Sequence, residues 1–140
     1  MTSNDDVNRD LVESLLTGPA YHKWLGLELL DAKPGQVVIG MAGRPEFCGN
    51  TDGTYIHGGL LATLADIAAD FALVTQVGIG LPTIDLRMDY LRPAKPGDYL
   101  RAVGTVVRRG RTLGVADALV ANGDGVKLAV GRGLYSTATP

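Results

Sequence analysis

The sequence has few of the side chains from which disulfide frameworks and metal centres are built. It contains one cysteine, Cys48, and two histidines, His22 and His57, which lie 35 residues apart. One cysteine cannot form an intramolecular disulfide, and such a chain is typical of a reducing compartment. Metal sites need several converging ligands, so we expect no metal.

Long apolar runs and an excess of positive charge are also missing. No run approaches the ~18 apolar residues of a transmembrane helix, and the polar start MTSNDDVNRD lacks the apolar core of a secretory signal. The 13 Lys and Arg residues stand against 15 Asp and Glu residues, so no basic field attracts nucleic acid. These absences predict a cytoplasmic protein that binds neither membrane nor nucleic acid.

Serine is scarce too, and this excludes a large class of hydrolases. The serines are Ser3, Ser14 and Ser136, and none stands in a G-x-S-x-G pattern, which excludes an α/β-hydrolase. No G-x-x-x-x-G-K-[ST] or G-x-G-x-x-G follows a predicted strand, so the common nucleotide-binding motifs are absent. Cys48 is disfavoured as a nucleophile because no acid partner and no predicted helix start stand beside it.

What the chain does have is enough apolar sequence for one folded domain. Hydrophobic residues make up 46% of its 140 residues, and a domain of this length buries roughly 68–70% of its unfolded surface. We find no internal repeat and no low-complexity linker, so we expect a single domain over residues 1–140. A short amphipathic helix is predicted over about residues 5–17, with Val7, Leu11 and Leu15 on its apolar face.

The longest predicted helix runs from residue 58 to about residue 77. Apolar residues cover most of its circumference, which is typical of a buried helix. Two carboxylates, Asp66 and Asp70, interrupt this apolar sequence. A lone carboxylate is costly to bury, so it should be paired, protonated or catalytic.

Strands are predicted on both sides of this helix. LGLELLDA and QVVIGMAG precede it, and four alternating segments follow it, namely TIDLRMDYL, DYLRAVGTVVR, TLGVADALVA and VKLAVGRGLYSTA. Turns rich in Pro, Gly and Asn join these four, so we predict an antiparallel meander. The result is an α+β domain in which a curved antiparallel sheet wraps around one long helix. Uncovered edges and one bare face predict a homodimer or a larger assembly.

Two segments carry a resemblance to a known family. HGGLLATLAD, residues 57–66, opens the long helix with His-Gly-Gly and places an acid nine residues after the histidine. TIDLRMDYLRPAKPGD, residues 83–98, follows in the family's order and spacing. Over about residues 20–138 the chain resembles hotdog-fold thioesterases, most closely the phenylacetate-pathway (PaaI-like) acyl-CoA thioesterases. The resemblance implies a hotdog fold and hydrolysis of acyl-CoA to a free acid and coenzyme A.

The start of the long helix is suited to acyl transfer. Gly58 and Gly59 leave N–H groups unobstructed at the positive end of the helix dipole, where an oxyanion is stabilised. The resemblance assigns the thioester carbonyl to the Gly58 N–H and makes Asp66 a nucleophile or a general base. It makes Thr83 the residue that orients Asp66. Close packing of the two glycines and a plain strand role for Thr83 are the structural alternatives.

Three further polar residues are candidates with less defined roles. The family commonly has N-x-x-G-x-x-H, whereas Asn50 lies seven residues before His57; Asn50 is still the candidate that holds the carbonyl or the water. His57 abuts the helix start, where closing the loop is a more common role than general base. Asp70 shares a helix face with Asp66, and we favour a structural role for it.

Basic residues around two predicted turns are candidates for binding the phosphates of coenzyme A, with ordinary solvated surface as an equal alternative. They are Arg92 with Lys95, and Arg108, Arg109 and Arg111. Coenzyme A is here part of the substrate, so we expect no separate cofactor.

The sequence therefore predicts an acyl-CoA thioesterase for an aromatic or a short- or medium-chain acyl group. By the resemblance, its site forms across a homodimer, with Asn50 and Asp66 from different subunits, and two dimers make a homotetramer. A hotdog dehydratase is disfavoured because His57 precedes the helix. A non-catalytic acyl-CoA-binding hotdog protein is the alternative. It is disfavoured because Asp66 is present and the first 20 residues are too few and too acidic for a DNA-binding segment.

Overall fold

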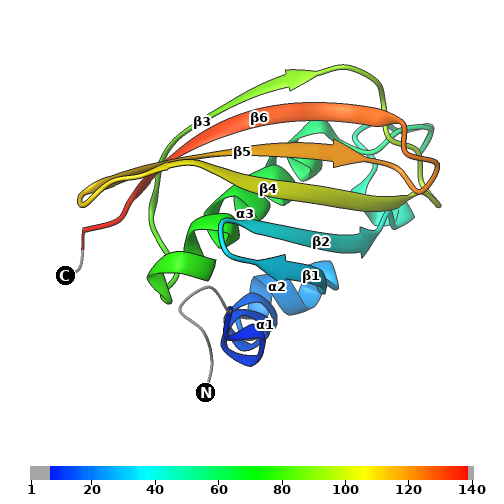
Figure 1. Cartoon of the computed structure of the whole chain (residues 1–140). Helices are drawn as coiled ribbons and strands as arrows, with labels where there is room; N and C mark the ends of the chain where they lie inside the picture. Colours follow the sequence, from blue (N-terminus) through cyan, green and yellow to red (C-terminus); the bar gives the residue numbers. More distant parts are fainter. Residues whose placement is uncertain (1–6, 139–140) are drawn as a thin grey trace.

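The computed structural model describes residues 7–138, in which one curved sheet packs against one long helix (Figure 1). The elements are α1 (Arg9–Thr17), α2 (Ala20–Leu25), β1 (Glu28–Lys33), β2 (Gln36–Ala42), the 3-10 helix η1 (Pro45–Phe47), α3 (Gly58–Val77), β3 (Thr83–Tyr90), β4 (Tyr99–Arg109), β5 (Leu113–Ala121) and β6 (Lys127–Ser136). The 6 antiparallel strands stand in the order β1-β2-β4-β5-β6-β3. The expected α+β architecture is confirmed. The helix expected over residues 5–17 begins at Arg9, and residues 5 and 6 lie outside the described residues.

Local sequence sets both ends of α3. His57 is the N-cap, and Gly78 closes the helix in a left-handed conformation with φ of 83°, which glycine adopts without strain. Most residues between the caps are buried, so burial on nearly all sides stabilises the helix rather than one apolar face. Within residues 7–138, α3 is the one helix long and apolar enough to span a membrane, and here its side chains fill the core of the domain.

Small residues let α3 lie close to the sheet. Gly104 on β4 faces the helix, and a Cβ atom at this position would overlap the carbonyl oxygen of Ala68. Buried alanines line the same contact from both sides: Ala65, Ala69 and Ala72 on α3, and Ala102, Ala116 and Ala118 on the strands. This close approach fixes the height of α3 above the sheet and, with it, the position of every side chain that α3 carries.

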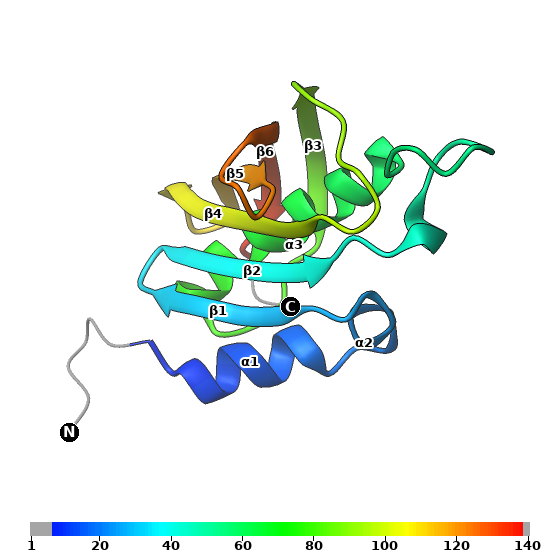
Figure 2. The ribbon, with the colours of Figure 1, turned by 90° about the vertical axis from the view of Figure 1, so that its right-hand side faces the viewer.

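The two edges of the sheet are covered differently. α1 runs beside β1 (Figure 2), and Arg9 donates a hydrogen bond from Nη2 to the Leu29 carbonyl oxygen at 3.0 Å. α1 buries Val12 and Leu16, whereas Leu11, expected on the apolar face, is 41% exposed. The expectation is wrong for Leu11 but holds for Val7 and Leu15, which are partly buried against the core. β3, at the opposite end of the sheet, is an edge strand with mostly exposed residues.

The expected four-stranded meander is only partly present. β4, β5 and β6 are consecutive neighbours, but β3 pairs with β6 and β4 pairs with β2. The prediction for β3 is wrong because residues 91–98 do not form a hairpin turn. They cross the end of the sheet, where Leu91 donates to the Leu128 carbonyl at 2.9 Å and Gly97 donates to the Gly43 carbonyl at 2.8 Å.

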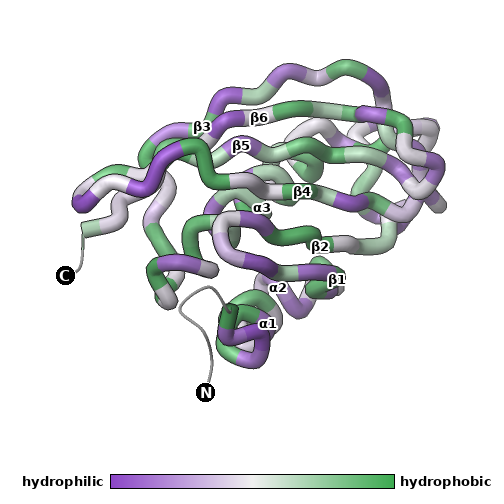
Figure 3. Tube along the Cα trace, in the orientation of Figure 1, coloured by the Kyte–Doolittle hydropathy of each residue, from purple (hydrophilic) through white to green (hydrophobic). Residues whose placement is uncertain are grey.

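Hydrophobic residues make up most of the central strands, and hydrophilic residues interrupt them at single positions (Figure 3). On β5 the burial pattern alternates residue by residue, so that one face packs on α3 and the other turns outward. The two-residue period of the strand therefore separates the core face from the outer face, and on β5 the outer face is itself largely apolar.

Substituting Gly104 tests the close contact between helix and sheet. We expect Gly104→Ala to lower the free energy of unfolding by about 1–3 kcal/mol, because the new methyl group meets backbone that must move away. Gly80→Ala is the control, since a Cβ there meets nothing within 4 Å. Chemical denaturation measures both. An equal free energy of unfolding for the two variants would contradict a close contact between Gly104 and the α3 backbone.

Candidate active site

The N-terminus of α3 offers one free backbone donor. The Gly59 N–H donates to His57 Nδ1 at 2.7 Å, and the Leu60 N–H donates to the His57 carbonyl at 3.0 Å. Within residues 7–138, no group accepts a hydrogen bond from the Gly58 N–H. Of the two glycines expected to offer donors, Gly59 is thus committed to the helix cap and Gly58 remains available. His57 is placed as the capping residue.

An apolar cavity of about 320 Å³ opens beside Gly58. Tyr55, Leu61 and Tyr90 are among its walls, and a Cβ on Gly58 would lie 3.3 Å from the Tyr90 ring. Arg92 lines this cavity and also a polar one of about 350 Å³ that contains Lys95. The free N–H therefore lies next to an apolar hollow whose rim carries a cation.

Asp66 lies two turns further along α3 and is half buried. Its Oδ1 accepts a hydrogen bond from Thr83 Oγ1 at 2.9 Å and another from the Tyr135 hydroxyl at 2.8 Å. Thr83 and Tyr135 are directly paired residues of β3 and β6. The structure thus contains the Thr83–Asp66 hydrogen bond that the sequence suggested and adds a second donor.

Sequence reasoning missed Tyr135. The alternation of β6 places Gly133 and Tyr135 on one face, and Gly133 leaves space that the Tyr135 ring fills. A tyrosine on the core face of a strand needs a partner for its hydroxyl. This requirement is the signal that could have directed attention to Tyr135, although only the fold identifies Asp66 as the partner.

Asp70, one turn beyond Asp66, is bound differently. Its Oδ1 accepts a hydrogen bond from the Leu81 N–H at 3.3 Å, which ties α3 to the segment leading into Thr83. Burial raises the pKa of Asp70 to about 7, the Leu81 N–H opposes this rise, and the charge of Asp66 adds to it. Asp70 therefore holds the start of β3 in place, in line with the structural role favoured from the sequence.

Asn50 is engaged within its own loop. Its Oδ1 accepts hydrogen bonds from the N–H groups of Thr54, at 3.0 Å, and Tyr55, at 3.4 Å, and its Nδ2 donates to Thr54 Oγ1 at 2.6 Å. The additional residue between Asn50 and His57 lies in this closed turn. One N–H of the amide remains for another partner, since Nδ2 carries two hydrogens.

The predicted basic residues fall into two groups at opposite ends of α3. Arg92 lies beside Gly58, whereas Arg109 and Arg111 line a cavity with Val77, the last residue of the helix. Arg108 belongs to the same hairpin as Arg109. The groups are roughly 30 Å apart along a helix of 20 residues. Within one chain they therefore cannot bind the same phosphate.

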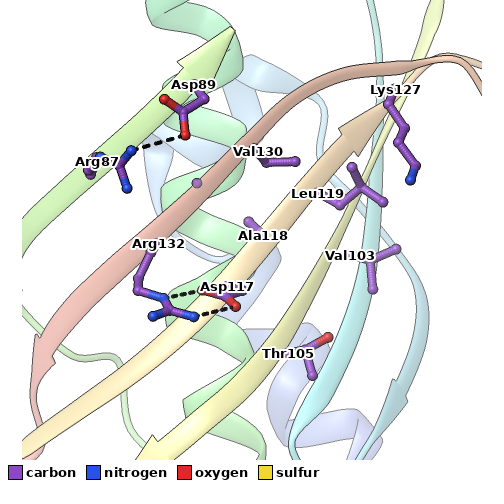
Figure 4. A pocket seen from close by; sticks show the side chains of 11 residues that line it. Arg87, Asp89, Val103, Thr105, Asp117, Ala118, Leu119, Lys127, Val130 and Arg132 are labelled. Carbon is purple, nitrogen blue, oxygen red and sulfur yellow. Dashed lines mark hydrogen bonds and ion pairs between the residues drawn. The ribbon is translucent and has the colours of Figure 1, made fainter. Parts of the chain in front are cut away.

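A further cavity lies away from these groups. It measures about 520 Å³ and opens on the outer face of the sheet, where Arg132 is paired with Asp117 and Arg87 with Asp89 (Figure 4). Neither Asp66 nor Gly58 reaches it. Among the described residues, no three His, Cys, Asp or Glu side chains gather as metal ligands. The α3 side of the sheet is thus where the reactive groups lie.

Comparison with known families agrees with this arrangement. The model of the family described as "Thioesterase superfamily" matches residues 53–129, more than half of the chain. The chain belongs to the thioesterase superfamily. The membership and hotdog fold expected from residues 57–66 and 83–98 are confirmed, and so is the assignment to the thioester hydrolases.

Relatives and a solved structure resemble this thioesterase over most of its length. Acyl-coenzyme A thioesterase 13 of Homo sapiens is 32% identical over 135 residues, which cover 94% of this chain and 95% of its own. The medium/long-chain acyl-CoA thioesterase YigI of Escherichia coli is 27% identical over 82% of this chain and 83% of its own. The E. coli PaaI protein of the phenylacetic acid degradation operon has a TM-score of 0.82 and 28% identity, over 91% of this chain and 90% of its own.

Stability as a function of pH tests the environment of Asp70. Its folded pKa of about 7 lies above the ordinary value of 3.8, so between these values the folded state holds a proton that the unfolded state releases. The folded protein therefore loses stability as pH rises through this range. Asp70→Asn keeps an oxygen for the Leu81 N–H and removes the charge. We expect it to melt roughly 5 °C or more above wild type at pH 8 and near wild type at pH 4.

Melting temperatures at several pH values between 4 and 8 give the comparison, with the exposed turn variant Asp124→Asn as the control. A difference between Asp70→Asn and wild type that stays constant over this range would contradict the burial of an uncompensated carboxyl group.

Proposed function

We propose that this protein hydrolyses acyl-CoA thioesters to a free acid and coenzyme A, with Asp66 as the reacting carboxylate. The position of Asp66 carries the proposal. It is a half-buried acid on an apolar helix, held by Thr83 at 2.9 Å, and among the described residues it has no ion-pair partner. A half-buried carboxylate that is oriented by hydroxyl donors but paired with no cation is better explained by a chemical role than by a structural one.

Two reaction routes are open to a carboxylate oxygen of Asp66. In one, an Asp66 oxygen bonds to the thioester carbon, the C–S bond breaks, and water then cleaves the resulting anhydride. In the other, Asp66 takes a proton from water, the hydroxide bonds to the carbon, and the proton passes to the departing coenzyme A thiolate. Both need an oxygen of Asp66 at the carbonyl carbon and a donor at the carbonyl oxygen.

The donor for that oxygen comes from a second copy of the chain. Gly58 and Asp66 stand eight residues apart on one helix, which separates them by ~12 Å along its axis. A nucleophile and an oxyanion donor must lie ~3 Å from neighbouring atoms of one carbonyl group. Asp66 of one chain therefore works with Gly58, and with the Asn50 loop, of another.

The edge strand β3 supplies the geometry for such a dimer. Thr83, at the start of β3, touches Asp66, and Tyr90, at its end, lies against Gly58. If β3 pairs antiparallel with its copy about the strand centre, the start of one strand lies opposite the end of the other. A register centred on Leu86 also places Asp85 opposite Arg87 of the second copy, which joins opposite charges. Two such dimers would form a tetramer.

The substrate follows from the surroundings of Gly58. The cavity beside it is mainly apolar and carries Arg92 at its rim, which suits an acyl or pantetheine segment beside a phosphate. Because Arg108, Arg109 and Arg111 lie at the end of α3 opposite to Arg92, we propose that the second copy supplies them to the same coenzyme A. One relative is named a medium/long-chain acyl-CoA thioesterase, and one similar structure is a protein of the phenylacetic acid degradation operon. We therefore propose aliphatic and aromatic acyl-CoAs as the substrates to test.

Binding of acyl-CoA without hydrolysis is the second candidate function. The observation that favours it is Asn50, whose amide is bonded to Thr54 and Tyr55 of its own loop. A site whose Asn50 stays in that loop would have only the second N–H of the amide left for the thioester, since the first is donated to Thr54.

Release of free thiol from a panel of aromatic and aliphatic acyl-CoAs tests the proposed function. We expect wild type to turn over part of the panel and Asp66→Asn to lose at least about 10³-fold in kcat, because the reacting oxygen is gone. Asp70→Asn is the matched control, one helical turn away, and should stay within about tenfold of wild type. Binding of the esters without thiol release would favour the second candidate and contradict hydrolysis.

A further inference from the structure

We propose that Tyr135 is a positioning residue for Asp66, which selects the carboxylate oxygen that meets the substrate. This inference rests on the proposed function, since it concerns how the same carboxylate is oriented for attack or for proton transfer.

The side-chain hydrogen bonds of Asp66 all fall on one of its two carboxylate oxygens. Its Oδ1 receives the Tyr135 hydroxyl at 2.8 Å and Thr83 Oγ1 at 2.9 Å. Within residues 7–138 no donor reaches Oδ2. Two donors at one oxygen fill its main acceptor directions, so Oδ2 is the oxygen left for a thioester carbon or a water.

The position of the two donors follows from strand pairing. Thr83 and Tyr135 are opposite residues in the antiparallel β3–β6 pair, so their side chains meet Asp66 from adjacent strands. The Tyr135 hydroxyl also lies 3.0 Å from the main-chain oxygen of Asp66. One hydroxyl thus contacts both the side chain and the backbone of Asp66, which limits rotation of the carboxylate.

The tyrosine itself is held rigidly. It is fully buried, with 0% of its surface exposed. Gly133 makes room for the ring, because a Cβ atom at Gly133 would overlap both the ring and its hydroxyl. A side chain locked by packing can hold a reacting group within the narrow range of geometry that catalysis needs.

The hydroxyl stays a donor throughout the working pH range. Burial raises the pKa of Tyr135 above its ordinary value, and the negative charge of Asp66 raises it further. The proton therefore remains on the phenol and is shared with the carboxylate, rather than lost from it.

The variant Tyr135→Phe removes the hydroxyl and keeps the ring. We expect kcat for thiol release to fall about 10–100-fold while KM changes less than about 3-fold, because binding does not use this hydroxyl. The melting temperature should fall only by roughly 2–8 °C, as for the loss of one hydrogen bond. Tyr99→Phe is the matched control, since the Tyr99 hydroxyl also donates to a carboxylate, that of Glu28, at 3.1 Å. Tyr99 lies on β4, which is separated by β5 from the β6–β3 pair that contacts Asp66.

A second comparison separates positioning from general support of the fold. In an Asp66→Asn background, adding Tyr135→Phe should lower the melting temperature again but leave the residual thiol release unchanged. If Tyr135→Phe lowered turnover in the Asp66→Asn background by the same factor as in wild type, the proposal would be overturned, because Tyr135 would then act through the fold and not through Asp66. So would a Tyr135→Phe enzyme with kcat within about twofold of wild type. The proposed function fails by a different result, a wild type that releases no thiol.

Discussion

The contact between α3 and the concave face of the sheet is the constraint on which the other features depend. Gly104 lets the helix backbone lie against β4, where a Cβ atom would overlap the carbonyl oxygen of Ala68, and buried alanines line the core around this contact. With the helix held at that height, Asp66 meets Thr83 and Tyr135 on the two strands at one edge of the sheet. The same contact places Gly58, at the N-terminus of α3, in the wall of the cavity that Tyr90 also lines. A shift of the helix would move both halves of the site.

Much of this could be predicted from the sequence where the signals are local. The bounds of α3 follow from His57, which caps it, and from Gly78, which ends it. The strands follow from the alternation of apolar and polar residues. Strand order could not be predicted in the same way, because residues 91–98 have the composition of a turn but cross the end of the sheet. Composition marks a loop without stating which strand the loop reaches.

The site shows the same limit. Asp66 and Thr83 could be predicted because the resemblance rests on a short motif and on the strand that follows it. Tyr135 could not, because its partner is 69 residues away and only the β3–β6 pairing joins them. The separation of Arg92 from Arg109 is likewise a property of the fold, since both stand at turns that look alike in sequence.

The central claim is that each site combines Asp66 of one chain with Gly58 of another, and mixing two inactive variants tests it most directly. Gly58→Pro removes the N–H; proline suits the first helical position, and His57, with ψ of 133°, already has the conformation required before proline. Gly58→Ala is its control, since it adds a Cβ atom and keeps the donor.

When Asp66→Asn and Gly58→Pro chains are unfolded together and refolded at equal amounts, half of the dimers are mixed and each mixed dimer has one intact site. The account predicts recovery of about a quarter of wild-type thiol release. Activity that stays at the sum of the two separate variants would contradict a site shared between chains.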